Sequence, residues 1–119
     1  MEDQFCYLTT TGRVSGRPHT IEIWFARQDD TLYVLSGGGT RSDWVRNLQR
    51  QPTVTVRLGR RDGRQLRGRA RVVDPGSPDD QLARRLVYEK YQGGYGGDLT
   101  RWRDGSLPVA VDLGDPAGG

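Results

Sequence analysis

The amino-acid sequence predicts an α+β fold in which six short antiparallel strands form a small closed or split β-barrel with two helices. Apolar and polar residues alternate in several short segments, which is typical of strands with one buried face. Turn residues such as Asp62-Gly63 connect neighbouring segments as hairpins. Two segments with helix-start signals interrupt the strands. This combination favours a barrel over a parallel α/β sheet.

The strands are expected where β-branched and aromatic residues alternate with polar ones. Their ranges are 5–11, 19–28, 31–36, 53–58, 65–73 and 107–113. The second strand places Thr20, Glu22 and Trp24 on one face and Ile21 and Ile23 on the other.

The two helices are expected after the third and fifth strands. The first begins at Thr40, which has Asp43 at capping-box spacing. The second begins with Ser77 as its N-cap and Pro78 in its first turn, and it runs to about Tyr91. Both helices therefore lie at the ends of the sheet.

Length and composition indicate one small domain over residues 1–113, followed by a flexible tail at 114–119. Cys6 is the only cysteine and His19 the only histidine, which excludes an intramolecular disulfide and the usual structural zinc site. We therefore expect a cytoplasmic protein. No apolar run approaches the ~18 to 20 residues that span a bilayer, so no integral membrane segment is expected.

The segment from Ser36 to Arg41 is the most informative motif. It joins the third strand to the first helix through Gly37, Gly38 and Gly39. Glycines let a ligand approach the backbone, and the N–H groups of a new helix attract anions. A glycine loop also occurs as a plain strand-to-helix turn, so by itself it leaves both interpretations open.

Three longer segments carry a family resemblance. They are LTTTGRVSGRPHTIEIWF (8–25), LYVLSGGGTRSDWVRNLQRQPTVTVRL (32–58) and KYQGGYGGDLTRWRDGSLPVAVDL (90–113). The motifs TTTGR-x-SG-x-P and SGGGT-R-x-DW-x-x-NL are fairly specific in combination. On these motifs the chain resembles the deazaflavin-dependent nitroreductase family, within the flavin-reductase-like split β-barrel superfamily.

The resemblance implies a six-stranded antiparallel split β-barrel of the FMN-binding, pyridoxamine-phosphate-oxidase-like kind. It also implies an F420-dependent nitroreductase or quinone reductase. Such an enzyme transfers a hydride from the reduced deazaflavin coenzyme F420 to a small-molecule acceptor of the quinone, nitroaromatic or enone type. Relatives in the superfamily bind FMN, or in some cases haem or a bilin, in a similar groove.

The resemblance places the acidic tail of the cofactor between the turn before the second strand and the glycine loop, where arginines suit a string of negative charges. The ring lies along the polar face of the second strand, and the first helix closes the other side. The cofactor-binding candidates are Arg13, Ser15, Gly16, Arg17, Pro18, Thr20, Glu22, Trp24, Ser36, Gly37, Gly38, Gly39, Thr40, Arg41, Trp44 and Asn47.

The catalytic candidates are Tyr91 and Tyr95. A phenol can donate a hydrogen bond to the negative charge that develops on an acceptor, and it does so at neutral pH without first titrating. Tyr88 is a weaker candidate because helical periodicity buries it. The glycines around Tyr95 suggest a mobile lid, and Trp102 is a candidate wall of the acceptor pocket.

Two positions depart from the family pattern. Val14 stands where many relatives carry a basic residue, and His19 stands where an arginine is common. Fewer basic contacts indicate a shorter or differently placed tail, or an FMN-like ligand. The chain also begins close to its first strand, which favours a soluble acceptor over a membrane quinone.

Three alternatives stay open. The fold could serve an FMN-dependent reductase or oxidase, or a non-catalytic cofactor carrier. A small β-barrel could also bind nucleic acid through the arginine ladder Arg67, Arg69 and Arg71. No aromatic residue interleaves with the arginines of 57–71, so we prefer the reductase and expect no nucleic-acid partner. The sequence leaves open whether the protein forms a homodimer.

Overall fold

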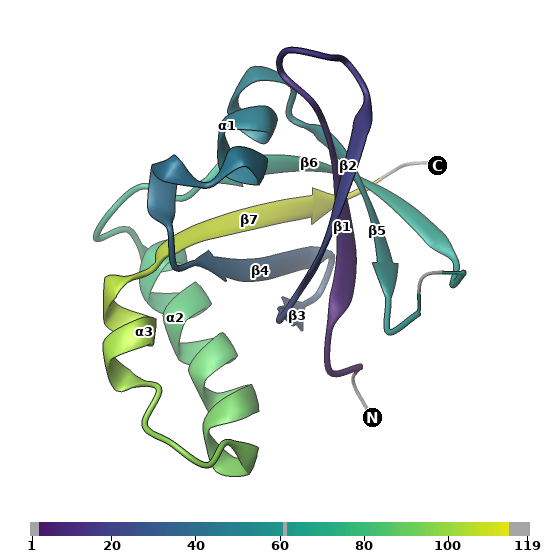
Figure 1. The fold of residues 1–119 in the computed structure, drawn as a ribbon. Coiled ribbons are helices and arrows are strands. Elements are labelled where there is room, and N and C mark those ends of the chain that lie inside the picture. The colour runs from purple at the N-terminus through teal and green to yellow at the C-terminus, as the bar shows by residue number, and fades with distance from the viewer. Residues whose placement is uncertain (1–2, 61, 115–119) are drawn as a thin grey trace.

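The computed structural model describes residues 3–60 and 62–114 (Figure 1). The strands are β1 (Cys6–Thr11), β2 (Pro18–Ile23), β3 (Ala26–Gln28), β4 (Thr31–Ser36), β5 (Thr53–Leu58), β6 (Gln65–Val72) and β7 (Leu107–Leu113). The α-helices are α1 (Asp43–Arg50), α2 (Pro78–Tyr91) and α3 (Thr100–Gly105), and the 3-10 turns are η1 (Gly39–Arg41) and η2 (Gln92–Gly94). The predicted flexible tail, 114–119, lies outside the described residues except for Gly114.

All seven described strands form one antiparallel sheet in the order β2-β1-β5-β6-β7-β4-β3. The predicted strand 19–28 is wrong in one respect, because it is two strands, and this makes seven strands in place of six. The chain leaves β2 after Ile23, where it pairs with β1, and enters β3 at Ala26, where it pairs with β4. Residues Trp24 and Phe25 thus carry the chain from one edge of the curled sheet to the other (Figure 1).

A side chain holds the break between β2 and β3. The Tyr91 hydroxyl accepts from the Phe25 N–H at 3.0 Å and lies at the same distance from the Phe25 carbonyl, to which it can donate. These contacts replace the ladder hydrogen bonds that a continuous strand would make. Phe25 is fully buried beside them. The sequence predicted one strand here because the alternation of apolar and polar residues continues through Trp24 and Phe25. Phe25 is buried in the core although the strand is interrupted.

Two hydrophobic clusters stabilise the fold. The first lies inside the curled sheet, where alternate residues of β1, β5, β6 and β7 meet α1, and includes Leu8, Val56 and Val109. The second lies between the outer face of β3, β4 and β7 and the helices α2 and α3, which Figure 1 shows together on that side. Burial of both clusters is the main favourable contribution to folding.

In its described residues the structure has one α-helix more than predicted, and the first α-helix begins later than predicted. The helix after the glycines begins at Asp43 with Ser42 as N-cap and no side-chain cap, so the predicted capping box at Thr40 is wrong. Residues Gly39–Arg41 form a 3-10 turn first. The cap of α2 is confirmed, because the Ser77 hydroxyl accepts from the Asp80 N–H at 3.2 Å.

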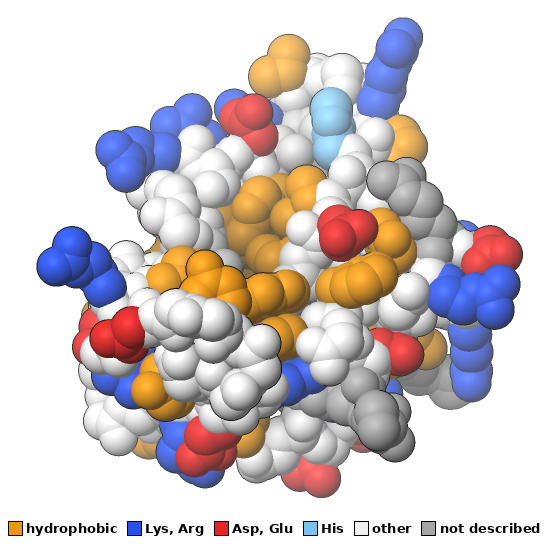
Figure 2. Space-filling view, turned by 60° about the horizontal axis from the view of Figure 1, so that its bottom comes forward, with side chains coloured by type: hydrophobic (Ala, Val, Ile, Leu, Met, Phe, Trp, Pro, Cys, Tyr) orange, Lys and Arg blue, Asp and Glu red, His pale blue; other side chains and the backbone are white. Residues whose placement is uncertain are grey.

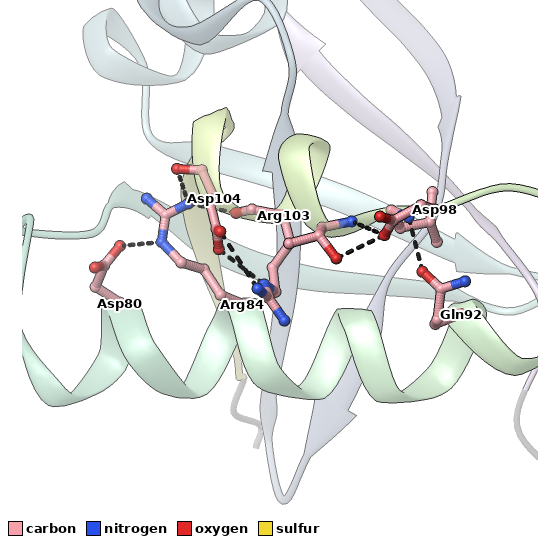
Figure 3. A network of polar contacts seen from close by, with 8 residues as sticks. Asp80, Arg84, Gln92, Asp98, Arg103 and Asp104 are labelled. Atoms are coloured by element: carbon pink, nitrogen blue, oxygen red, sulfur yellow. Dashed lines mark hydrogen bonds and ion pairs between the residues drawn. The ribbon is translucent and has the colours of Figure 1, made fainter.

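Helix α3 was not predicted, and it is tied to α2 by polar contacts (Figure 3). Arg84 of α2 pairs with Asp80 at 3.0 Å and donates to the Asp104 carbonyl of α3 at 3.1 Å. Asp98 accepts from the backbone N–H of Thr100 at 2.9 Å, just before the helix. Asp98 followed by Thr100 is the sequence signal that could have located this short helix.

Candidate functional site

A groove of about 480 Å³ lies between the turn that joins β1 to β2, the start of β2, and the first turns of α1. Its volume falls within the roughly 300 to 1,000 Å³ of small-molecule sites. The lining residues are Gly12, Arg13, Val14, Ser15, His19, Thr20, Ile21, Asp43, Trp44 and Asn47. Figure 2 shows hydrophobic side chains gathered in a hollow on this face, with acidic side chains and the histidine close to it and basic side chains mainly farther out.

Arg13 is the positively charged group of the groove, and α1 holds it in place. Its Nη1 donates to the Asn47 Oδ1 at 2.9 Å, and its Nη2 pairs with the Asp43 Oδ1 at 3.2 Å. Its backbone N–H also donates to Asn47 Oδ1, at 3.1 Å. Among the described residues these contacts leave donors of the guanidinium unused, since it carries five N–H groups. The Arg13 side chain keeps 30% of its surface exposed and can reach a ligand.

Asn47 connects three elements. Besides its two contacts with Arg13, it donates from Nδ2 to the Thr10 hydroxyl on β1 at 3.2 Å. The residue is buried, with 3% of its surface exposed. A buried amide whose groups are all hydrogen-bonded fixes its neighbours, because breaking any one contact costs desolvation without compensation.

The turn before β2 is closed by its own backbone. The Gly12 N–H donates to the Arg17 carbonyl at 2.8 Å, and the Gly16 N–H donates to the Gly12 carbonyl at 2.9 Å. A Cβ on Gly12 would lie 2.7 Å from Nε2 of His19 and 2.8 Å from the Ser15 hydroxyl. A larger residue at position 12 would therefore require the exposed His19 and Ser15 side chains to move from this wall of the groove.

The glycine loop lies next to the groove but does not line it. Gly39 has φ +59°, which favours glycine, whereas Gly37 and Gly38 have ordinary φ values. The Ser36 hydroxyl contacts the Gly39 carbonyl at 3.3 Å and the Ser42 hydroxyl at 3.0 Å. These contacts close the turn, so the loop has a structural task whatever else it binds.

Four aromatic side chains gather at the other end of β2. Trp24 stacks on Tyr91 with ring centroids 4.2 Å apart and planes 4° apart. Tyr95 and Trp102 meet the Trp24 ring edge-on at 5.9 Å and 5.7 Å. A Cβ on Gly37 would lie 3.8 Å from Nε1 of Trp102, so the glycine loop lies between this aromatic group and α1.

The two catalytic candidates sit in different surroundings. Tyr91 is buried, and its hydroxyl contacts the Phe25 backbone and the Gln4 carbonyl. Tyr95 is 48% exposed, and both tyrosines line a small hollow of about 160 Å³ together with Trp24 and Lys90. Of the two hydroxyls, that of Tyr95 has the better access to a substrate.

The structure brings some of the predicted cofactor residues together and separates others. Arg13, Ser15, Thr20, Trp44 and Asn47 line the groove. Trp24 joins the aromatic group, and Glu22 lies on the face opposite Ile21, where it accepts from the Tyr7 hydroxyl at 3.1 Å. The other predicted residues do not line the groove; they are Gly16, Arg17, Pro18, Ser36, Gly37, Gly38, Gly39, Thr40 and Arg41.

Sequence reasoning missed the apolar side of β2. His19 and Ile21 line the groove together with Thr20, whereas the prediction placed the ring on the face of Thr20 and Glu22, and Glu22 does not line the groove. At an edge strand of a split barrel, the face that would enter the core opens to solvent where the sheet does not close. The adjacency of Gly12 and His19 across the turn gave no signal in the sequence, because the contact depends on the hairpin.

Other kinds of chemistry find no support in the described residues. Burial raises the pKa of the Cys6 thiol to about 12, although the charge of Lys90 lowers it somewhat, so this thiol is not a nucleophile at neutral pH. No group of three or more His, Cys, Asp or Glu residues in 3–60 and 62–114 could hold a metal ion.

Comparison with known proteins identifies the family. The F420H(2)-dependent quinone reductase family model matches residues 1–114. The chain belongs to this family. An F420H(2)-dependent quinone reductase of Mycobacterium tuberculosis strain H37Rv is 29% identical to it over 107 residues, which are 87% of this chain and 69% of that protein. Membership makes the protein an oxidoreductase with coenzyme F420 as its cofactor.

Solved structures show the same fold. HutZ, the heme storage protein of Vibrio cholerae, matches with a TM-score of 0.73 at 15% identity, over 97% of this chain and 84% of that one. A FAD-binding protein of Mesorhizobium loti matches with a TM-score of 0.63 at 18% identity, over 95% and 83%. The predicted antiparallel split barrel of the FMN-binding kind is thus confirmed for this family member, with seven strands.

The groove fits a planar anionic cofactor. Its volume lies within the range of small-molecule sites, Trp44 and Ile21 line it with apolar surface, and Arg13, held by Asn47, lines it with a positive charge. None of the helices in the described residues is both long enough and apolar enough to cross a bilayer.

Proposed function

We propose that the protein reduces a quinone or a related activated acceptor, nitroaromatic or enone, with F420H2 bound in the groove between β2 and α1. The observation that carries the proposal is that Arg13 lines an open groove and is held there by Asn47, with part of its surface exposed. Preorganised charged donors bind anions well because no reorganisation is needed on binding. In this proposal the protein is cytoplasmic and its partner is a small-molecule substrate.

Separate parts of the chain would hold the cofactor. Arg13 would bind its anionic end, together with Ser15 and the flanking residues Gly16, Arg17 and Pro18. Residues Ser36–Arg41 would form the other side of that end. Trp44, Ile21 and Thr20 would hold the ring and exclude water from it, since they line the groove beside Arg13. Bound F420H2 would supply the hydride.

Tyr95 would contact the acceptor. Its exposed phenol stands beside the Trp24 ring, and it can donate a hydrogen bond to an acceptor oxygen at neutral pH. Trp24 and Trp102 offer flat apolar surfaces against which an aromatic acceptor can pack. The Tyr91 hydroxyl already contacts backbone groups, so we assign Tyr91 to the support of Trp24.

A nucleic-acid partner has weaker support. Arg71 of the arginine ladder pairs with Asp112 at 2.9 Å and with Asp79 at 3.1 Å, so its charge is already balanced. The exposed Arg67 and Arg69 alternate with Gly68 and the buried Ala70, with no aromatic residue between them for base stacking.

The test is a titration with reduced and oxidised F420, followed by deazaflavin fluorescence, with FMN as the control ligand. Binding of F420 and turnover with a panel of quinones, nitroaromatics and enones are expected. Binding of FMN with no response to F420 would overturn the proposal. Arg60 lies in the exposed hairpin after β5, so Arg60→Ala is the matched control for changes made at Arg13.

A further inference from the structure

The two partners of Arg13 differ in how firmly they are held. Asn47 is buried and hydrogen-bonded at both ends of its amide. Asp43 pairs with Arg13 at 3.2 Å, yet its side chain is 83% exposed. An exposed carboxylate can leave an ion pair at little cost, because water solvates it fully. One partner of Arg13 is therefore fixed and the other can exchange.

The Asp43 carboxylate has the same charge as the proposed ligand and lies in the same groove. It is an anion that lines the groove, and it stands in the first turn of α1, where negative charge is favourable. An acidic group of a ligand bound at Arg13 would meet this carboxylate across the guanidinium. The two anions would repel each other if both remained in contact with the same cation.

We infer that Asp43 is a specificity-determining residue that competes with the bound anion for Arg13. Its carboxylate occupies Arg13 in the ligand-free protein and moves aside when an anionic ligand binds. Affinity for anions is lower than Arg13 alone would give, because the ligand must displace the Asp43 carboxylate. A doubly charged phosphate, which Arg13 attracts more strongly, is therefore favoured over a singly charged anion. The inference rests on the proposed function where it takes F420 as the ligand. Its test does not, because binding of inorganic phosphate can be measured whether or not F420 binds.

Removal of the competing charge should tighten binding. Asp43→Asn is expected to increase affinity for F420 and for inorganic phosphate about two- to fivefold, the range of an exposed ion pair. The effect requires Arg13, so Asp43→Asn made in the Arg13→Ala background should change affinity by less than about 1.5-fold. Asn47→Ala should weaken binding instead, because Arg13 loses its fixed partner.

The experiment measures two ligands in parallel. F420 binding is followed by deazaflavin fluorescence, and inorganic phosphate binding by the NMR signals of the backbone N–H groups of the β1–β2 turn, which every variant keeps, including those in the Arg13→Ala background. Asp62→Asn is the matched control, because Asp62 is an exposed carboxylate that pairs with Arg60 at 3.1 Å and also changes net charge by one. Thermal unfolding checks that each variant keeps its fold.

The outcomes separate the inference from the proposed function. Tighter phosphate binding by Asp43→Asn, absent in Asp62→Asn and in the Arg13→Ala background, supports competition even if F420 fails to bind. Unchanged or weaker phosphate binding by Asp43→Asn overturns it, even if F420 binds and turns over. An equal gain in Asp62→Asn also overturns it, because the effect would then come from net charge.

Discussion

The two ends of β2 are attached to the rest of the molecule by different chemistry. Near its start, the adjoining turn is tied to α1 by the contacts of Arg13 with Asn47 and Asp43. Just past its end, Trp24 stacks on Tyr91 of α2, and the Tyr91 hydroxyl contacts the Phe25 backbone. The first attachment borders a groove of about 480 Å³, and the second encloses little space.

Together with the proposed function, this difference assigns ligand binding to one end of β2 and stability to the other. Polar contacts such as those of Arg13 act through a few directed atoms, so they can hold a turn in place without filling the space beside it. Aromatic stacking fills its space and contributes apolar burial. Changes at the polar end should therefore alter ligand binding, whereas changes at the aromatic end should alter stability.

Arg13→Ala should have the largest effect. We expect affinity for F420 to fall about 10- to 100-fold, because hydrogen bonds between charged groups contribute roughly 1.5 to 3 kcal/mol. The free energy of unfolding should change by less than about 1 kcal/mol, since the ion pair with Asp43 is exposed. The buried Asn47 Oδ1 also stays satisfied, because the backbone N–H of residue 13 still donates to it. Fluorescence titration and urea unfolding measure the two quantities. A large loss of stability would remove the contrast between the two ends.

Tyr91→Phe should show the opposite pattern. The change removes the hydroxyl that satisfies the buried Phe25 N–H, so unfolding free energy should fall by about 1 to 3 kcal/mol. Affinity of the folded protein for F420 should stay within about twofold. Chemical denaturation measures the first, with Tyr95→Phe as the control for loss of an exposed phenol. If turnover were lost while stability stayed unchanged, Tyr91 would instead be a catalytic residue, as predicted from the sequence.

Tyr95→Phe sharpens the comparison, because Tyr95 touches the aromatic group yet is exposed. We expect turnover to fall about tenfold from loss of one hydrogen-bond donor, with stability unchanged. Single-turnover kinetics with a quinone would separate this effect from product release. Full turnover on every accepted substrate would exclude the Tyr95 hydroxyl from the mechanism.

Arg41→Ala tests the glycine loop. The exposed Arg41 does not line the groove, so we expect a loss of F420 affinity of about two- to fivefold, smaller than at Arg13. The fold should stay intact, and the same fluorescence titration measures the change. A loss as large as that of Arg13→Ala would move the main anion contact from the β1–β2 turn to the loop.

Asp112→Asn should have the smallest effect, as it lies outside both ends of β2. The hydrogen bond from Arg71 lowers the pKa of Asp112, so its contribution to stability is present above the unfolded-state value near 4 and is lost as pH falls through the folded-state pKa. Both side chains are more than two-fifths exposed, so we expect at most about 0.5 kcal/mol at pH 7. The difference from wild type should vanish in acid, as measured by denaturation at several pH values.

Much of the fold could be predicted because it depends on local signals. Alternation located β1, β4, β5, β6 and β7, and Ser77 with Pro78 located the start of α2. The break between β2 and β3 could not be predicted, since it depends on Tyr91, which is distant in sequence. The start of α1 was displaced from Thr40 to Asp43 because Gly39 turns the chain first.

About half of the residues that line the groove could be predicted from the sequence. The sequence indicated that Arg13, Ser15, Thr20, Trp44 and Asn47 belong together, and the structure places all of them on one groove. It indicated His19 only as a departure from the family pattern, and it did not indicate Ile21 or Asp43, which only the hairpin and the curl of the sheet bring there.

The sequence by itself determined which residues form strands and where charge is available, because alternation, glycines and arginines act over a few neighbouring residues. Only the tertiary structure decided which face of β2 opens to a ligand and which partners Arg13 has. Those outcomes depend on where a curled sheet fails to close, and closure is set by packing between segments far apart in the chain.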